Sequence, residues 1–351
     1  MLNWKGAMVE AIENRWAFLV GINHYRERQQ FPPLNFCVSD VEAVQTLLQQ
    51  VGYTTVCLHD GLDYSEPRFP EAKNIRAELQ SLCSKVGPND LLLVYFACHG
   101  TRQGDGQPRL IAWDTRSINL DETAIKVRDV EDWLRASAAK RLVLLIDACH
   151  IGTGKGGRSL ADQEFVRQVY ELAEGFHLLA ASTDQQQAWE KSGHGVFSYH
   201  LLQGLSGAAD LEGKNFVSVN DLKRYVQGGI ARWSVESGYE QRPAGQSDGD
   251  LGDMILVDYR QRSRPDVSSL LGVTSQVAEV ARGAEKVAAV ERPISSSQRR
   301  FYQNSLTRKQ EELAALEGQL GAEINAMDEL KLTRQIEILL QQIEKLEQQL
   351  R

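Results

Sequence analysis

The sequence predicts an α/β fold, in which a mostly parallel sheet of about six strands carries helices on both faces. Through roughly the first 260 residues, short continuous apolar runs alternate with stretches of helical periodicity. A continuous apolar run is typical of a strand buried on both faces, and strand–helix alternation is typical of a parallel sheet. The chain has 351 residues, 42% of them hydrophobic, which suffices for one large core and an appendage.

Six apolar runs are the expected strands, at 17–22, 54–59, 91–97, 142–148, 176–182 and 254–258. The stretches between them have the apolar spacing of amphipathic helices, which are expected at 39–50, 73–86, 128–137, 160–173, 196–207 and 218–232. Two of the strands differ from the rest, because a reactive side chain follows the apolar run. Residues 91–100 read LLLVYFACHG, and residues 142–152 read LVLLIDACHIG.

These two strands end in His99 and Cys149. Ligands of open parallel sheets bind outside the carboxyl ends of the strands, so both side chains are expected where chemistry is usually done. A thiol is a strong nucleophile only as the thiolate, and a nearby imidazole supplies the base and the stabilising cation. A free cysteine is more often buried and inert, but a histidine at the matching strand end favours a nucleophile. The histidine precedes the cysteine by 50 positions (149 minus 99), which is the order and approximate spacing of caspases.

Together the two motifs resemble the His-Gly and Asp-x-Cys-His signatures of the caspase-like peptidases, and most of all those of the metacaspase and bacterial orthocaspase branch. The similarity runs from RWAFLVGINHY (15–25) to DMILVD (253–258). It implies a caspase-like three-layer sandwich with a His99–Cys149 dyad. The backbone N–H groups of Gly100 and Cys149 are the expected oxyanion hole, because a residue without Cβ lets its N–H approach the substrate carbonyl.

The chain departs from the family signatures beside both catalytic positions. Ala97 and Cys98 stand where the usual signature has Ser-Gly. Ala148 and Ile151 replace the first Cys and the final Ser of the usual Cys-Cys-His-Ser. The dyad survives both departures, so we expect activity with an altered pocket wall.

Three carboxylates are expected to read the substrate. Asp147 lies two residues before Cys149, so strand alternation puts both side chains on one face. Asp40 lies in a segment that resembles the metacaspase Cys-x-x-Asp motif, and Glu190 follows a tryptophan where true caspases carry Trp-Arg. Carboxylates bind a planar guanidinium bidentately, which predicts cleavage after Arg or Lys. Ser182 is expected to line the same pocket. The ordinary alternatives are that Asp40 caps the following helix and that Glu190 is a solvated loop charge.

A glycine-rich segment, GTGKGGRSL at 152–160, follows the nucleophile. Such a segment is typical of an exposed loop that is readily nicked. Lys155 and Arg158 suit the enzyme's own expected pocket and are therefore candidate self-processing sites. A phosphate-binding loop is the competing interpretation, but the Gly-Lys-Ser/Thr that should open a helix is missing.

No metal or other cofactor is expected. Cysteine and histidine are neighbours at 98–99 and at 149–150, but adjacent strand residues point to opposite faces and the spacing of a zinc site is absent. Calcium-regulated relatives carry an acidic residue a few positions after the nucleophile, where this chain has cationic residues. Calcium dependence is therefore disfavoured, although Asp114, Asp129 and Glu131 keep it open.

The sequence divides into a peptidase domain at 1–260, a linker at 261–295 and a helical module at 296–351. The module is rich in Leu, Glu and Gln and contains no proline. In its second half, apolar residues recur at alternate spacings of 4 and 3, which is the pattern of a heptad seam. These residues are Leu332, Ile336, Leu339, Ile343, Leu346 and Leu350. A helical hairpin or a short coiled coil is expected, which binds a protein partner or a second copy of the chain.

Composition excludes several other classes of protein. The net charge of -8 argues against nucleic-acid binding, and no apolar stretch approaches the 18 residues of a membrane span. Five cysteines without C-x-x-C spacing suit a reducing cytoplasm. We therefore expect a cytoplasmic cysteine endopeptidase for protein substrates with basic residues at the cleavage site, activated by self-processing or by a partner. The alternative is a catalytically weak caspase-like scaffold or adaptor in a bacterial signalling or defence system.

Overall fold

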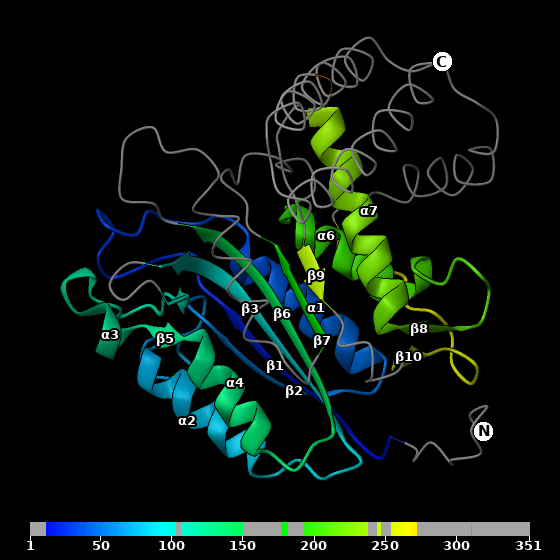
Figure 1. Ribbon diagram of the computed structural model, residues 1–351, viewed down its shortest axis with the longest axis horizontal. Helices are drawn as coiled ribbons and strands as arrows, with labels where there is room; N and C mark the ends of the chain where they lie inside the picture. Colours follow the sequence, from blue (N-terminus) through cyan, green and yellow to red (C-terminus); the bar gives the residue numbers. More distant parts are fainter. Residues whose placement is uncertain are drawn as a thin grey trace, which may run out of the picture. The chain divides into compact units, whose positions relative to one another are not determined.

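Five of the six apolar runs of the sequence form strands of one large sheet (Figure 1). The computed structural model describes residues 12–102, 107–150, 177–181, 193–237, 244–246, 254–271 and 310. The chain divides into two compact units, residues 1–231 with 241–278 and residues 232–240 with 279–351. The sheet and the helices that cover it belong to the first unit.

Six strands follow one another across the sheet in the order β2-β1-β3-β6-β7-β9. All neighbouring strands are parallel except β9, which runs antiparallel to β7. Two short strands, β4 and β5, extend the carboxyl end of β3 in antiparallel pairing. The prediction of a mostly parallel sheet of about six strands is confirmed. The bounds are β1 (Arg15–Gly21), β2 (Thr54–His59), β3 (Leu91–Thr101), β4 (Arg109–Leu110), β5 (Ile125–Lys126), β6 (Arg141–His150), β7 (His177–Ala181) and β9 (Ala244–Gln246).

Helices cover both faces of this sheet (Figure 1). Helices α2 (Ala72–Cys83) and α4 (Val127–Ala136) lie together on one face, and α1 (Cys37–Gln50) and α6 (Val196–Gln203) lie on the other. Five of the six expected helices are present within a few residues of their expected bounds, and the sixth, at 160–173, lies outside the described residues. Short helical turns that the sequence did not indicate are η1 (Ser117–Asn119) and α3 (Leu120–Thr123). The π-helical turn η3 (Gly204–Ala208) continues α6 through the rest of the expected helix at 196–207.

One expected strand lies in a different place. The run at 254–258 forms β10 (Ile255–Asp258), but it pairs antiparallel with β8 (Phe216–Ser218) in a separate two-stranded sheet. The sixth place in the main sheet belongs to β9 instead. Its sequence, Ala-Gly-Gln, contains no β-branched or aromatic residue, so propensity gave no sign of a strand there. Apolar periodicity identifies strands, but it does not identify their partners.

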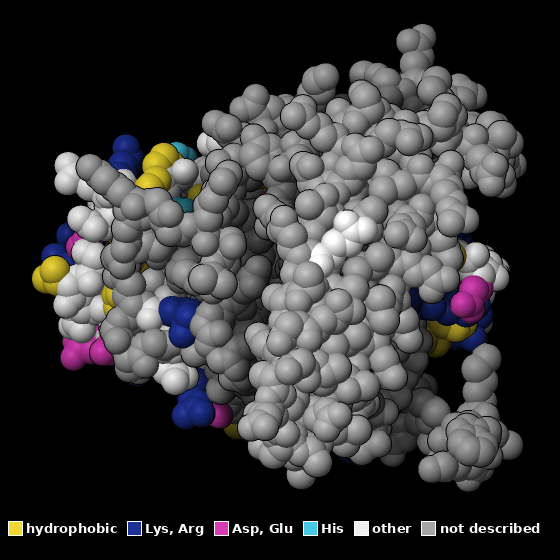
Figure 2. All heavy atoms as spheres, turned by 45° about the horizontal axis from the view of Figure 1, so that its top comes forward, with side chains coloured by type: hydrophobic (Ala, Val, Ile, Leu, Met, Phe, Trp, Pro, Cys, Tyr) yellow, Lys and Arg dark blue, Asp and Glu magenta, His cyan; other side chains and the backbone are white. Residues whose placement is uncertain are grey.

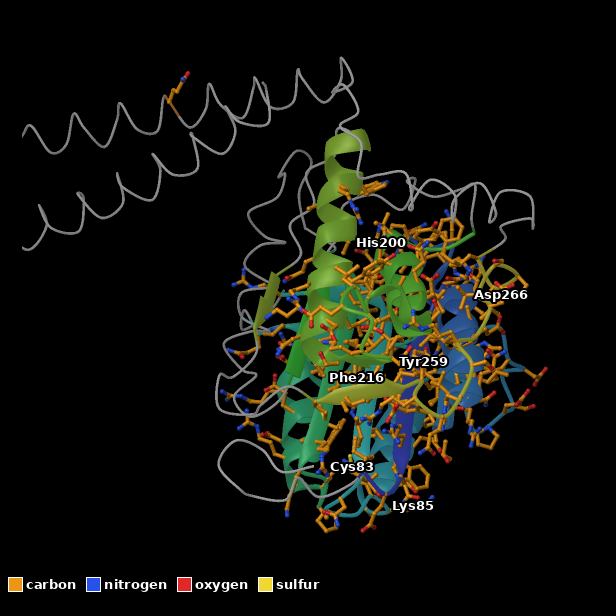
Figure 3. All side chains as sticks on the ribbon, turned by 90° about the vertical axis from the view of Figure 1, so that its right-hand side faces the viewer. Cys83, Lys85, His200, Phe216, Tyr259 and Asp266 are labelled. Atoms are coloured by element: carbon orange, nitrogen blue, oxygen red, sulfur yellow. The ribbon has the colours of Figure 1, made fainter. Side chains whose placement is uncertain are left out.

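The small sheet is held to the rest of the fold by aromatic and cationic side chains. Phe216 and Tyr259 mark it in Figure 3, and the Tyr259 hydroxyl donates a hydrogen bond to the carbonyl oxygen of Leu205. The ring of Phe216 has two cationic neighbours, Lys214 at 4.9 Å and Arg260 at 5.5 Å from the ring centroid. These contacts anchor the chain that leaves β10.

Helix α7 (Val219–Ser237) packs closely against α6. The Ser218 hydroxyl and the Asp221 carboxylate bond each other's backbone N–H groups, a capping box that starts α7. Further along, a Cβ at Gly229 would lie 2.5 Å from the ring of His200, which is labelled in Figure 3. Glycine at this position lets the two helices approach.

Glycine also sets the distance between α1 and the sheet. A Cβ at Gly21, the last residue of β1, would lie 2.4 Å from the carbonyl oxygen of Cys37. Real Cβ atoms do not come this close, so the first turn of α1 can rest on the end of β1 only because Gly21 has no side chain. This contact places Asp40, in the first turn of α1, at the carboxyl end of the sheet.

Near the left edge of the face in Figure 2, basic, acidic and hydrophobic side chains of described residues lie next to one another. Among the described helices, none is long and apolar enough to cross a membrane.

Candidate active site

The carboxyl ends of β3 and β6 bring the two expected catalytic positions together. These strands are adjacent and parallel, and their register pairs His99 with Cys149 and Gly100 with His150. Neighbouring strands lie about 4.8 Å apart, so the two backbone positions are next to each other. The described part of Cys149 is its backbone. A histidine and a cysteine at one level of one sheet edge are the geometry that the matched motifs indicated.

The ring of His99 is fixed by the loop that follows β1. Its Nε2 lies 2.7 Å from the carbonyl oxygen of Pro32. A carbonyl oxygen only accepts hydrogen bonds, so Nε2 carries the hydrogen and Nδ1 is the nitrogen that can take a proton. The backbone N–H of His99 donates to the Tyr25 hydroxyl at 2.9 Å, and the two rings lie 4.9 Å apart. His99 is only 6% exposed, so its orientation is set before a substrate arrives.

The loop that holds His99 is itself tied to β2. The carboxylate of Asp60 accepts hydrogen bonds from the backbone N–H groups of Asn23 and His24, both at 2.8 Å. The backbone N–H of Leu34 donates to the carbonyl oxygen of Asn23 at 2.7 Å and closes the loop. The sequence analysis missed these positioning residues, as it did Tyr25 and Pro32. The only available signal was their place just after a buried strand.

Asp40 and Asp147, two of the three carboxylates expected from the sequence, lie close together. Asp147 is on β6, and Asp40 approaches from α1 on the helical layer. Both carboxylates face Gly195, since a Cβ there would lie 3.1 Å from Asp40 Oδ2 and 3.6 Å from Asp147 Oδ2. Burial, and then the nearby charge of Asp40, raises the pKa of Asp147 to about 8. Asp147 is therefore mostly protonated at neutral pH, and a nearby cation would favour its ionised form.

Asp40 is buried and accepts several hydrogen bonds. His194 Nδ1 lies 2.7 Å from Asp40 Oδ1, and the backbone N–H of Gly195 lies 3.3 Å from each carboxylate oxygen. Ser198 also bonds this carboxylate, and its Oγ lies 2.7 Å from the Tyr95 hydroxyl. Burial raises the pKa of Asp40 against the effect of these donors. The alternative that Asp40 caps α1 is wrong, because the helix begins at Cys37 after Phe36 and has no side-chain cap.

His194 is a site residue that sequence reasoning missed. It precedes α6, 154 residues from Asp40 in the chain. Burial lowers the pKa of His194, but the hydrogen bond and charge of Asp40 outweigh burial, so the net shift is upward. A histidine followed by glycine at a helix start was the only available signal, and it does not reveal the partner.

Several expected site residues lie outside the described residues: Ser182, Glu190, Lys155 and Arg158. Their roles stay predictions, and so does the oxyanion hole of Gly100 and Cys149, although Gly100 lies within β3 at the expected place. Of the calcium candidates, Asp114 accepts the backbone N–H of Ala72 at 2.8 Å, and Glu131 is buried, which raises its pKa to about 8. Within the described ranges, no group of three or more His, Cys, Asp or Glu side chains is placed to hold a metal ion.

Comparison with known families gives two matches along the chain. Residues 14–250 match the family model of the C14 peptidases, described as the caspase domain. Residues 294–351 match the model described as effector-associated domain 9. The first match spans the sheet, its helices and every described site residue except Leu270, which contacts His194 from the segment after β10.

Curated relatives are metacaspases. Metacaspase-4 of Arabidopsis thaliana is 26% identical over 202 residues, which is 56% of this chain and 45% of the relative. Metacaspase-1 of Mycosarcoma maydis is 31% identical over 154 residues, 40% of this chain and 36% of the relative. The chain thus spans less than half the length of these relatives.

Proposed function

Because the chain belongs to the caspase-domain family of C14 peptidases, we propose that it is a cysteine endopeptidase with Cys149 as nucleophile and His99 as base. The observation that carries the proposal is the register that pairs these two residues at the carboxyl ends of adjacent strands. The fixed orientation of His99 supports it, because the bond to Pro32 leaves Nδ1 as the nitrogen that can accept the thiol proton.

The reaction proceeds through an acyl-enzyme. His99 Nδ1 takes the proton of the Cys149 thiol, and the thiolate adds to the carbonyl carbon of the scissile peptide bond. The N–H groups of Gly100 and Cys149 hold the oxyanion, and each such donor is worth about 3 kcal/mol in related chemistry. The C–N bond then breaks, and the imidazolium returns its proton to the leaving amine. Water, deprotonated by His99, hydrolyses the thioester and regenerates the thiol.

The proposed substrates carry Arg or Lys at the cleaved position. Asp147 and Asp40 bring two carboxylates together beside Gly195, where a Cβ would lie 3.1 Å from Asp40 Oδ2 and 3.6 Å from Asp147 Oδ2. A guanidinium or ammonium group that approaches Asp147 would be drawn to its ionised carboxylate. Glu190 and Ser182 are proposed to complete the pocket.

Activation is proposed to occur by self-processing or through a partner. Lys155 and Arg158 in the glycine-rich segment match the proposed specificity. The helical module at 296–351 is proposed to recruit a protein partner or a second copy, and the match of 294–351 to an effector-associated domain supports a role in recruitment. The cytoplasm is the proposed location, and we propose no cofactor.

Hydrolysis of small fluorogenic peptides tests the proposal. Peptides that end in Arg or Lys before the reporter should be cleaved by the full chain, and Asp peptides should not. Cys149→Ala should abolish cleavage. Cys98→Ala is the matched control, because Cys98 is a buried cysteine on the neighbouring strand to which the mechanism assigns no chemistry. If the folded, unmodified chain cleaves no peptide and only recruits partners, the scaffold alternative is correct.

A further inference from the structure

His194 connects the buried carboxylate of Asp40 to the chain that follows β10. That chain runs from Tyr259 past Asp266, both labelled in Figure 3, to Leu270. His194 Nδ1 lies 2.7 Å from Asp40 Oδ1, and its Nε2 lies 2.6 Å from the carbonyl oxygen of Leu270. His194 is 4% exposed and Asp40 is 2% exposed. The proposed mechanism gives this histidine no role.

The two hydrogen bonds of His194 determine the number of protons in the pair. The carbonyl oxygen of Leu270 can only accept, so Nε2 carries a hydrogen. At 2.7 Å, Nδ1 and the Asp40 oxygen must also have a hydrogen between them, because two lone pairs would repel each other. The pair is therefore either imidazolium with carboxylate or imidazole with carboxylic acid. Its net charge is zero in both forms.

The hydrogen-bond donors around Asp40 favour the ionised form of the pair, against burial, which raises the pKa of Asp40. The Gly195 N–H, at the start of α6, donates to both oxygens, and helix N-termini favour negative charge. Ser198 bonds the same carboxylate. Hydrogen bonds from several donors stabilise a carboxylate over a carboxylic acid.

We infer that His194 and Asp40 form a proton-sharing pair of zero net charge, which leaves Asp147 as the carboxylate whose charge selects the basic side chain of the substrate. The inference rests on the proposed function, since it assumes that this side chain enters beside Asp147. It refines the role expected for Asp40 from the sequence. His194 acts through Asp40 and is thus a positioning residue for specificity.

Charge balance gives the reason for such a pair. Two uncompensated carboxylates would leave one buried negative charge unpaired after a single Arg or Lys had bound, and unpaired buried charge is costly. With His194 in place, one ionised Asp147 meets one substrate cation. Among the described residues, the other titratable groups near this cluster are Tyr95 on β3 and Cys37 on α1. Burial keeps the Tyr95 hydroxyl protonated, so it adds no charge.

The test is peptide binding to the full chain with Cys149→Ala, which prevents turnover, measured from pH 6 to pH 9 by fluorescence anisotropy. The probes are an arginine peptide and its citrulline analogue, which has the same shape without the charge. Two neutral replacements of His194 keep different hydrogen bonds. His194→Asn retains a donor toward Asp40, and His194→Gln retains one toward Leu270, so a folded variant is expected from at least one.

Both replacements remove the His194 charge that offsets part of the effect of Asp40 on Asp147, so the full charge of Asp40 should act on Asp147. The pH of half-maximal arginine-peptide binding should then rise by about one unit, and affinity at pH 7 should fall about tenfold. Adding Asp40→Asn to His194→Asn removes that charge and should move the midpoint back. A folded His194 variant with an unchanged midpoint overturns the inference, and so does a double variant whose midpoint does not return. If the parent shows no preference for arginine over citrulline at any pH, the proposed specificity itself fails.

Discussion

Binding of a basic peptide should strengthen steeply between pH 6 and pH 8, because Asp147 must lose a proton before it can attract a cation. Burial and the charge of Asp40 raise its pKa to about 8. A raised carboxyl pKa means that the neutral acid dominates below this value and the carboxylate dominates above it. The perturbations are therefore pH itself and Asp147→Asn, which removes the titration and keeps the shape.

The size of the effect follows from the ionised fraction. With a pKa of about 8, about 1% of Asp147 is ionised at pH 6, about 9% at pH 7 and about 50% at pH 8. Apparent affinity scales with the binding-competent fraction, so it should rise about ninefold from pH 6 to 7 and about fivefold from pH 7 to 8. Removing one partner of a buried charge pair costs about 2–5 kcal/mol, and Asp147 is only half-buried, so Asp147→Asn should weaken binding at pH 8 by the lower figure, about 30-fold.

Isothermal titration of an arginine peptide into the full chain with Cys149→Ala measures this dependence without turnover. Asp147→Asn on the same background should bind weakly with a shallow pH profile, and the citrulline peptide should show little pH dependence with either protein. A flat profile in the parent would refute the electrostatic reasoning. The same would follow if the full pH rise persisted in Asp147→Asn, because another group would then control binding.

Three further outcomes are expected from other parts of the chain. Gly21→Ala should lower the free energy of unfolding by about 1–3 kcal/mol, because the new Cβ meets a backbone carbonyl at 2.4 Å; Gly228→Ala, which meets nothing within 4 Å, should be neutral or slightly stabilising in denaturant titrations. Intact-mass analysis should show cuts after Lys155 or Arg158 in the active chain and none in the nucleophile variant; an active enzyme that never cuts there would contradict self-processing. Deleting 296–351 should preserve small-peptide hydrolysis and abolish partner binding or assembly; a folded but inactive truncation would place the tail in the active machinery.

The sheet and the alignment of His99 with Cys149 on adjacent strands were predictable from the sequence for local reasons. A strand that is buried on both faces has a continuous apolar run in its sequence. The runs of β3 and β6 are followed by residues with reactive side chains, His99 and Cys149. Strand alternation also predicted that Asp147 and Cys149 share one face of the sheet, and this stays a prediction. The position of Asp40 near Asp147 was expected from the family resemblance. Its physical basis is the contact of α1 with Gly21, which only the structure shows.

The groups that orient the site were not predictable, because they come from distant parts of the chain. His99 is held by the backbone carbonyl of Pro32, 67 positions away. Every residue has a backbone carbonyl, so the type of residue at position 32 does not indicate this contact. His194 meets the carbonyl of Leu270 across 76 positions. The sixth sheet strand, β9, was missed because its three residues include none of the types that favour strands and its partner β7 lies far away in the sequence. Single-sequence patterns report local burial, whereas these contacts depend on the tertiary fold.

Covalent labelling of the full chain with an arginyl peptide that carries a thiol-reactive warhead tests the central claim most directly. Peptide mapping by mass spectrometry should place a single adduct on Cys149. The adduct should be absent in Cys149→Ala, strongly slowed in His99→Ala and retained in Cys98→Ala. A folded chain that forms no adduct at Cys149, or that is labelled there equally fast without His99, would contradict a His99–Cys149 peptidase.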